Sequence, residues 1–387
     1  MRILFTSTAG PGHLNPLFPL ARAARAAGHD VLFAVPGTAV ERPARLGFAA
    51  AATDDGIPSP AEMAFWQSLP THQDGNTAVI GEYFGRLRPI AVLESTGTIV
   101  ADFRPDVIVS EQAEFAGRLQ AELCGLPHVT VGIMSTDLAG CSVRPLIDNL
   151  DAIRASIGLP ANGEHPWYEG TQYVTGVPRV LQMSSVPLPA GTVRYRYEDA
   201  EGAPPAPGPV RIGRRRVYAT LGTAAARQPM AAPAFSALVA ALGDVDADVV
   251  FTAGDFDPSR LWTVPPNVRV AAYLPQSETM DVDVVVGHGG AGTTSAALSR
   301  GIPIVAVPLF ADQGHNAGQV VQAGAGVVVD ARRIDTDLAP AVATVLGDPS
   351  FRAAAGRIAA ENAALPSAAA VLGLVLGERA TPVRRAG

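Results

Sequence analysis

The stretch VVVGHGGAGTTSAALSRGIPIVAVP, Val284–Pro308, decides the fold of this chain. An apolar run leads into a cluster of glycines, a helix rich in small residues follows, and a second apolar run, Pro303–Pro308, closes the unit. A strand, a turn, a helix and a second strand in this order are typical of a parallel α/β sheet. Glycines let the backbone approach a ligand closely, and the first amides of a helix lack partners within it, so the turn predicts an anion site.

Composition narrows the class of protein. The chain has 387 residues, enough for two domains, and 48% of them are hydrophobic, which excludes global disorder. A net charge of −7 argues against a nucleic-acid partner. The two cysteines, Cys124 and Cys141, lack zinc-site spacing. No run of about 18 apolar residues, the length needed to span a membrane, occurs in the sequence. The apolar run at the N-terminus is too short for a signal peptide. We therefore expect a reduced, cytoplasmic protein without a membrane partner.

Both halves of the chain show the same alternation of strands and helices. The expected strand Ile3–Ser7 opens the first half, and Arg216–Leu221 opens the second. Between the two halves, the stretch GAPPAPGP, Gly202–Pro209, can form neither a helix nor an inner strand. We expect Val180–Ser184 to be the last strand of the first half, and Met134–Pro178 shows no regular period. The predicted fold is α/β with two doubly wound domains, residues 1–200 and 213–365, joined by a linker at 201–212. A helix and tail at 366–387 follow, for which packing back on the first domain is one alternative.

Two side chains with catalytic chemistry follow strands of the first domain. His13 follows a glycine turn after the first strand, and Glu111 follows the strand Asp106–Ser110. Open parallel sheets bind ligands beyond the carboxyl ends of their strands, so both residues are expected at one edge. Imidazole suits proton transfer near neutral pH, and a carboxylate can hold it as in catalytic dyads. The alternatives are a His that only caps a helix and a Glu on the surface, while Asp137 is an alternative base.

Other motifs are incomplete or ambiguous. The GxGxxG fingerprint fails after the first strand, where Asn15 replaces the third glycine, and no P-loop or GxSxG motif occurs. Asp281-Val282-Asp283 is similar to the DxD that holds a metal in some sugar transferases, but it leads into a buried strand, so we treat the match as coincidence. Aromatic residues scattered between Asp54 and Arg88 fit either ordinary helix packing or the wall of an apolar pocket.

Six motifs together give a family resemblance. They are GPGHLNP (Gly10–Pro16), RPDVIVSE (Arg104–Glu111), LGT (Leu221–Thr223), YLPQ (Tyr273–Gln276), GHGGAGTT (Gly287–Thr294) and PLFADQGHNA (Pro308–Ala317). None is specific alone, but in this order they make the chain resemble GT-B glycosyltransferases of the GT1 type, especially bacterial enzymes that decorate antibiotics and other natural products. The resemblance covers nearly the whole chain and implies two Rossmann-like domains that face each other across a cleft.

The resemblance also implies roles for single residues. His13 matches the general base that deprotonates the acceptor, and Glu111 matches its dyad partner, which is Asp in many relatives. The positions that match donor-binding residues are Thr223, Tyr273, Gln276, His288, Gly289, Gly290, Gly292, Thr293, Asp312 and Gln313. The candidates for the acceptor pocket are Phe65, Trp66, Tyr83, Phe84, Met134 and Asp137.

Two departures from the family pattern bear on the donor. Gly287 stands where bacterial relatives often have His, and Ala296 stands where the plant branch has an acidic residue that grips the ribose hydroxyls. A site without that acceptor fits a deoxyribose, which favours a TDP-sugar as co-substrate over a UDP-sugar.

The expected reaction is an inverting, metal-independent and cofactor-free transfer of a sugar or deoxysugar to a hydroxyl of a hydrophobic polyketide, macrolide or aromatic aglycone. The alternatives are a UDP-sugar donor, transfer to nitrogen or carbon, an enzyme acting on a lipid-linked peptidoglycan precursor, an epimerase or nicotinamide enzyme, and a non-catalytic auxiliary partner of another transferase. The oligomeric state is open, with a homodimer as one alternative.

Overall fold

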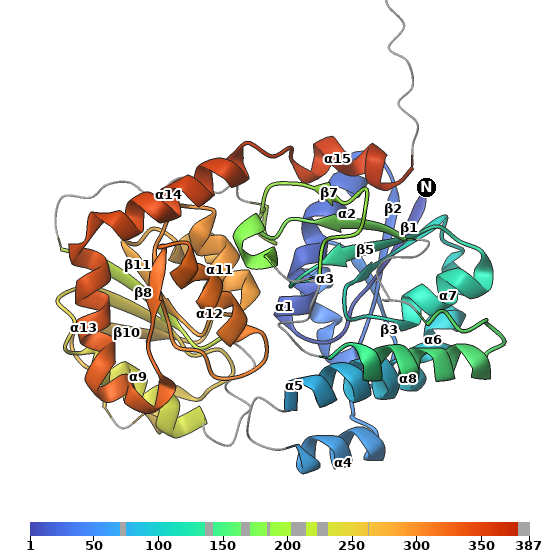
Figure 1. The fold of residues 1–387 in the computed structure, drawn as a ribbon. Helices are drawn as coiled ribbons and strands as arrows, with labels where there is room; N and C mark the ends of the chain where they lie inside the picture. The colour runs from blue at the N-terminus through green and yellow to red at the C-terminus, as the bar shows by residue number, and fades with distance from the viewer. Residues whose placement is uncertain are drawn as a thin grey trace, which may run out of the picture.

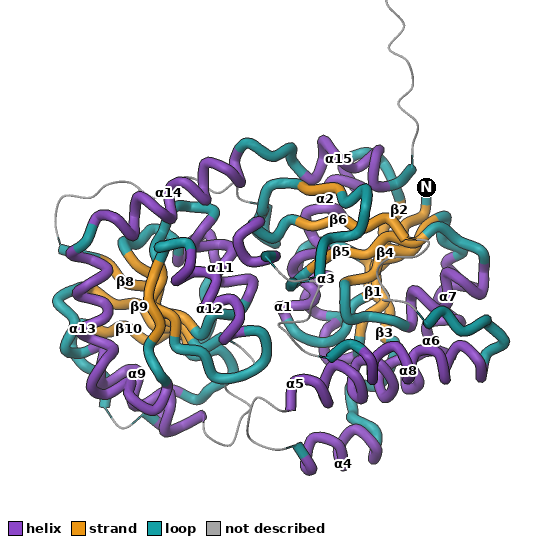
Figure 2. Tube along the Cα trace, in the orientation of Figure 1, coloured by secondary structure: helices purple, strands orange, loops and turns teal. Residues whose placement is uncertain are grey.

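The computed structural model describes residues 1–69, 75–135, 142–163, 171–183, 186–202, 214–222, 231–261 and 263–377. These residues form two lobes, each with a parallel sheet between layers of helices (Figures 1 and 2). In the described part of the chain, the first sheet has seven strands in the order β3-β2-β1-β4-β5-β6-β7, and the second has six in the order β10-β9-β8-β11-β12-β13. The expected pair of doubly wound α/β sheets is therefore confirmed.

The first lobe is built as follows. Its strands are β1 (Arg2–Thr6), β2 (Asp30–Val35), β3 (Ala49–Ala52), β4 (Val107–Glu111), β5 (His128–Gly132), β6 (Thr171–Thr175) and β7 (Val193–Arg194). Its helices are α1 (Pro11–Leu14), α2 (Phe18–Ala26), α3 (Glu41–Arg45), α4 (Pro60–Ser68), α5 (Gly75–Ala78), the π-helix η3 (Val79–Leu87), α6 (Arg88–Phe103), α7 (Ala116–Cys124) and α8 (Arg144–Ser156).

Strand β1 explains why this sheet is covered on both faces. Ile3 and Phe5 belong to a hydrophobic cluster with α2, whereas Leu4 belongs to a second cluster on the opposite face with residues of α6 and α7. Successive side chains of a strand point to opposite faces, so a strand that is apolar throughout requires helices on both sides. β1 pairs in parallel with β2 on one side and with β4 on the other, so the order in which strands are added to the sheet reverses at β1. The carboxyl ends of β1 and β4 form the switch point where such sheets bind ligands.

The second lobe repeats this plan. Its strands are β8 (Arg216–Thr220), β9 (Asp248–Thr252), β10 (Val268–Ala271), β11 (Val284–Gly287), β12 (Ile304–Ala306) and β13 (Gly326–Val328). Its helices are α9 (Ala231–Leu242), α10 (Gln276–Thr279), α11 (Ala291–Leu298), α12 (Gln313–Gln322), α13 (Ile334–Gly347) and α14 (Pro349–Ala363). Val284 and Val286 pack on one face and Val285 on the other, and β11 pairs with β8, so the switch point of this sheet lies between those two strands.

Two expectations about the end of the first half are wrong. The run expected as a strand contains a 3₁₀ helix, Arg179–Gln182, because Leu181 is buried in a cluster with second-lobe residues such as Met280 and Ile302. The apolar run thus packs the two lobes together instead of entering a sheet. The segment without a regular period contains α8 and β6, and α8 carries Leu146 and Leu150 at helical spacing.

The end of the described chain crosses back to the first lobe. Helix α14 lies over the second lobe, and α15 (Ala368–Val375) lies over α2 (Figure 1). Val371 and Leu372 are buried in the same cluster as Ile3 and Phe5. The expected linker at 201–212 lies almost entirely outside the described residues. Within the described ranges no single helix is long and apolar enough to cross a membrane, although α14 and α15, bent by 48°, pass that test as a pair.

Candidate active site

His13 and Glu111 meet at the switch point of the first sheet. Gly10, with φ +115°, turns the chain after β1, and His13 lies in the short helix that follows. His13 Nδ1 lies 3.0 Å from Glu111 Oε1, the imidazole is 22% exposed, and the carboxylate is completely buried. The pair therefore presents a partly accessible imidazole on a buried carboxylate.

Glu111 is surrounded by hydrogen-bond donors. Its Oε1 accepts from Thr8 Oγ1 at 2.8 Å and from Thr8 N at 3.3 Å, and its Oε2 accepts from Ala113 N at 2.6 Å. Burial by itself raises the pKa of Glu111, but His13 and these donors outweigh burial and hold the pKa below its usual range. The carboxylate is charged at neutral pH. Thr8 was not among the predicted site residues, although a hydroxyl residue just after a strand end was a usable signal.

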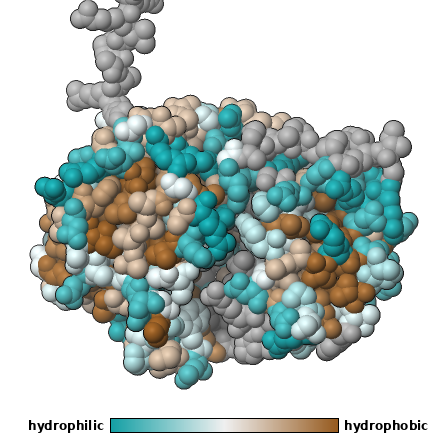
Figure 3. Space-filling view, turned by 180° about the vertical axis from the view of Figure 1, so that it is seen from behind, coloured by the Kyte–Doolittle hydropathy of each residue, from teal (hydrophilic) through white to brown (hydrophobic). Residues whose placement is uncertain are grey.

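The pKa of His13 reflects both lobes. Burial lowers it, but the Glu111 carboxylate opposes burial by its charge and hydrogen bond, and Asp312 of the second lobe adds a smaller effect in the same direction. The net result is a pKa above the ordinary 6.5. Because Asp312 lies close enough to influence His13, the two lobes meet at this imidazole. Figure 3 shows the surface hollowed between them.

Four of the candidate acceptor residues form a row of aromatic rings that leads from His13 to the surface. The ring centroids of His13 and Phe84 lie 5.4 Å apart, those of Phe84 and Tyr83 5.1 Å, and those of Tyr83 and Trp66 4.7 Å. Phe65 stacks on Tyr83, and Trp66 is 44% exposed. Met134 and Phe84 pack against one hydrophobic cluster around Phe115 and Leu146. The structure thus brings these candidates together beside the imidazole, whereas Asp137 lies outside the described residues.

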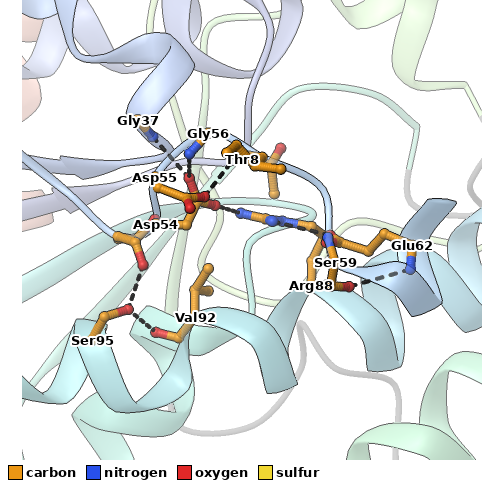
Figure 4. A network of polar contacts seen from close by, with 12 residues as sticks. Thr8, Gly37, Asp54, Asp55, Gly56, Ser59, Glu62, Arg88, Val92 and Ser95 are labelled. Carbon is orange, nitrogen blue, oxygen red and sulfur yellow. Dashed lines mark hydrogen bonds and ion pairs between the residues drawn. The ribbon is translucent and has the colours of Figure 1, made fainter.

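Arg88 fixes the two helices that carry these rings. Arg88 begins α6, directly after η3, and its bond to Glu62 Oε1 at 3.0 Å ties this end of η3 to α4, while its bond to Asp54 Oδ2 at 2.7 Å ties it to the loop after β3 (Figure 4). Ser59 and Glu62 form a capping box at the start of α4. Arg88 was not among the predicted site residues.

The π-helix η3 is held in place by close packing against α8. A Cβ at Gly81 would lie 2.6 Å from Pro145 Cβ, and one at Gly85 would lie 2.8 Å from Leu146 Cδ1. Asn149 Nδ2 donates to the carbonyl of Gly81 at 2.8 Å. Such wide helical segments often occur at functional sites, and this one carries Tyr83 and Phe84.

The glycine turn of the second lobe packs around His288. A Cβ at Gly222 would lie 2.6 Å from His288 Nε2, and one at Gly290 would lie far inside van der Waals contact with the same atom. Gly289 has φ +83°, and a Cβ there would lie 2.7 Å from the carbonyl oxygen of Gln313. Gly222 and Gly290 therefore let the backbone pack against the His288 ring, and Gly289 lets the turn approach the start of α12.

His288 is neutral in this environment. Burial lowers its pKa to about 4, and the backbone of Thr220 opposes the shift only weakly. A neutral imidazole donates one hydrogen bond. Gly290 caps α11 without a side-chain hydrogen bond, and Thr293 in the first turn is half-buried. The donor of the His288 ring serves the Thr220 backbone, so the arrangement offers an anion the first amides of α11 beside the ring.

The turn at 309–312 is held by the side-chain amides of two residues of α12, Gln313 and Asn316. Gln313 Oε1 accepts from the amides of Leu309 at 2.8 Å and Phe310 at 3.1 Å, so only its Nε2 can serve a ligand. Asn316 Nδ2 donates to Gly289 O at 2.9 Å and to Asp312 Oδ2 at 2.9 Å. This turn places Asp312 opposite His13.

The remaining donor candidates are less informative. Tyr273 is 54% exposed, and its hydroxyl lies 3.4 Å from Glu201 Oε1. Gln276 begins α10, and a Cβ at Gly292 would meet no atom within 4 Å. Thr223 lies outside the described residues.

The two departures from the family pattern are both accommodated by packing. A Cβ at Gly287 would meet nothing closer than 3.7 Å, so packing does not require glycine there. Ala296 is completely buried in an apolar cluster.

The DxD-like residues lie at the opposite end of β11 from His288. Asp281 Oδ2 pairs with Arg216 Nη1 at 3.0 Å, and Asp283 Oδ1 pairs with Arg215 Nη1 at 3.3 Å. Both aspartates form ion pairs at the amino ends of β8 and β11, whereas the candidate site lies at the carboxyl ends of the strands.

Comparisons with known proteins agree with this geometry. Residues 236–376 match the family described as erythromycin biosynthesis protein CIII-like, C-terminal domain. The chain is 31% identical over 385 residues to the L-demethylnoviosyl transferase of Streptomyces niveus, which covers 96% of each chain. The chain belongs to this family of antibiotic glycosyltransferases.

Further relatives support the same family. The glycosyltransferase is 28% identical over 419 residues, 97% of each chain, to the 3-alpha-mycarosylerythronolide B desosaminyl transferase of Saccharopolyspora erythraea. It superimposes with a TM-score of 0.77 and 26% identity on the spinosyn rhamnosyltransferase SpnG, over 97% of this chain and 100% of that one. SpnG has been solved with thymidine diphosphate and with the spinosyn aglycone. The glycosyltransferase has the GT-B fold.

Proposed function

We propose that this glycosyltransferase transfers a sugar from a TDP-sugar to a hydroxyl of a hydrophobic natural-product aglycone, with inversion and without a metal or other cofactor. The observation that carries the proposal is the His13–Glu111 pair, which faces Asp312 of the other lobe at the switch point of the first sheet. An imidazole with a raised pKa is a competent proton acceptor, and the opposite lobe offers an anion site for the leaving group.

In the proposed mechanism His13 is the general base. Nδ1 is occupied by Glu111, so Nε2 takes the proton from the acceptor hydroxyl. The oxygen then attacks the anomeric carbon as the bond to the diphosphate breaks, which inverts the configuration in one displacement. Glu111 stabilises the imidazolium that forms. The departing diphosphate is stabilised by the first amides and dipole of α11, so no metal is required.

The donor assignment has two supports. The apolar environment of Ala296 offers no carboxylate to a ribose 2′-hydroxyl, which favours a deoxyribose nucleotide. A related enzyme, SpnG, has been solved with thymidine diphosphate. We infer that the exposed ring of Tyr273 stacks on the base.

The acceptor assignment rests on the aromatic row. Rings from Phe84 to Trp66 extend from the base toward solvent, and such a wall suits a flat or greasy aglycone. The named relatives act on compounds of antibiotic biosynthesis, and SpnG has been solved with its aglycone.

The test is a turnover screen of TDP- and UDP-sugars against polyketide, macrolide and aromatic aglycones, read by product mass with and without EDTA. We expect TDP-sugars to give O-linked products at a rate that EDTA leaves unchanged. We expect His13→Ala to bind TDP normally and to lose turnover. Better turnover with UDP-sugars, C-linked products, or a fully active His13→Ala would each refute the corresponding part. Donor binding without turnover by the intact protein would favour an auxiliary role.

A further inference from the structure

The turn that carries Asp312 contains a residue in an unfavourable conformation. Ala311 has φ +57°, in the left-handed region that residues with a Cβ rarely adopt. The penalty corresponds to roughly a five- to thirtyfold bias against this geometry. The direction of the Asp312 side chain depends on this backbone, because Asp312 is the next residue. Contacts around the turn must therefore hold it.

The contacts come from both lobes. From the second lobe, Gln313 binds the amides at the start of the turn, and Asn316 binds Asp312 itself. From the first lobe, Asn76 Nδ2 donates to the carbonyl oxygen of Ala311 at 2.9 Å. The bond joins residues 235 positions apart, so it forms only when the lobes face each other as in this structure.

Asn76 is also linked to the acceptor wall. It lies in α5, which continues directly into η3, and η3 carries Tyr83 and Phe84. The start of this continuous helical segment thus contacts the turn that lies opposite His13, and its later part carries two rings of the aromatic row.

We propose that Asn76 is a positioning residue: by bonding the Ala311 carbonyl across the cleft, it holds Asp312 where the donor sugar binds. The acceptor lobe thereby takes part in recognising the donor sugar. This inference rests on the proposed function and on the family resemblance, in which Asp312 matches a residue that binds the donor. Thymidine diphosphate alone has no sugar at that position, so the contribution of Asn76 is absent from its binding.

The experiment compares Asn76→Ala with Gln319→Ala. Gln319 Nε2 also donates across the lobes, to the carbonyl oxygen of Met183 at 3.4 Å, but away from the turn. We expect Asn76→Ala to lower kcat/KM for the TDP-sugar by roughly five- to thirtyfold, with unchanged TDP affinity by calorimetry and unchanged melting temperature. Gln319→Ala should leave all three quantities unchanged.

A rescue separates positioning from general structural damage. Glycine adopts φ +57° without a Cβ penalty, so Ala311→Gly should restore most of the activity that Asn76→Ala loses. An active Asn76→Ala, a matching loss of TDP affinity, or no rescue by glycine would each overturn the inference. Inactivity of the wild-type chain with every donor would overturn the proposed function and this inference with it, whereas an active wild type and an equally active Asn76→Ala would overturn only the inference.

Discussion

Replacing Glu111 by Gln tests the proposed dyad most directly. The substitution keeps the shape of the side chain but removes the charge beside His13. The carboxylate accepts from Thr8 and His13 on one oxygen and from Ala113 on the other. An amide has one oxygen and one NH₂ group, so one orientation places the NH₂ group against the backbone N–H of Ala113 and the other places it against the backbone N–H of Thr8. If the NH₂ group faces His13, it donates to Nδ1 and forces the proton onto Nε2, which then cannot act as a base.

The size of the effect follows from the contacts. A charge-assisted hydrogen bond contributes about 1.5–3 kcal/mol, and one pKa unit corresponds to about 1.36 kcal/mol. Loss of the charge should therefore lower the pKa of His13. In the wild type, activity requires neutral His13, so kcat/KM should fall as the pH drops through a pKa above 6.5. In the variant, burial still lowers the pKa of His13 but the Glu111 charge no longer raises it, so the acid limb of the pH profile should move to a pH below 6.5.

The assay is the pH dependence of kcat/KM at saturating donor, from about pH 5 to 9 around the ordinary histidine pKa. We expect the plateau to drop by about 10²- to 10⁴-fold, the range for a general base that is lost or misoriented. His13→Ala is the control, because it should remove the acid limb altogether. An acid limb that stays in place in Glu111→Gln, at undiminished rate, would refute the assignment of Glu111 as the partner of His13.

Three further perturbations test the rest of the site and the fold. Gly290→Ala should push a methyl group into His288, destabilise the turn by about 1–3 kcal/mol and weaken TDP binding in calorimetry, whereas unchanged affinity would contradict the anion site. Phe84→Ala should raise KM for the aglycone more than KM for the donor in steady-state kinetics, and an equal rise in both would count against an acceptor wall. Arg300→Ala leaves the buried carboxylate of Asp199 without its ion-pair partner and should lower the free energy of unfolding in urea by about 3–5 kcal/mol, and a loss below about 1 kcal/mol would show that the pair is not buried in solution.

Several features could be predicted because they depend on local pattern. The apolar strands and the glycine turns after β1 and β11 follow from short-range chemistry, so the two parallel sheets were expected correctly. His13 and Glu111 could be paired in advance because parallel strands end at one edge of a sheet. The same local reasoning failed for Val180–Ser184, where an apolar run packs against the other lobe instead of pairing as a strand.

The amino-acid sequence by itself determined most of the strands and helices and the residues that stand at the ends of β1, β4 and β11. The tertiary structure alone decided what faces those residues. Gly289 and Gly290 in the opening stretch proved to be required by Gln313 and His288, whose positions depend on packing between separate elements. Asn76 carried no recognisable signal, because its hydrogen bond joins two lobes and depends on their relative placement. Contacts between residues far apart in the chain arise only when whole elements have packed, and no local pattern encodes them.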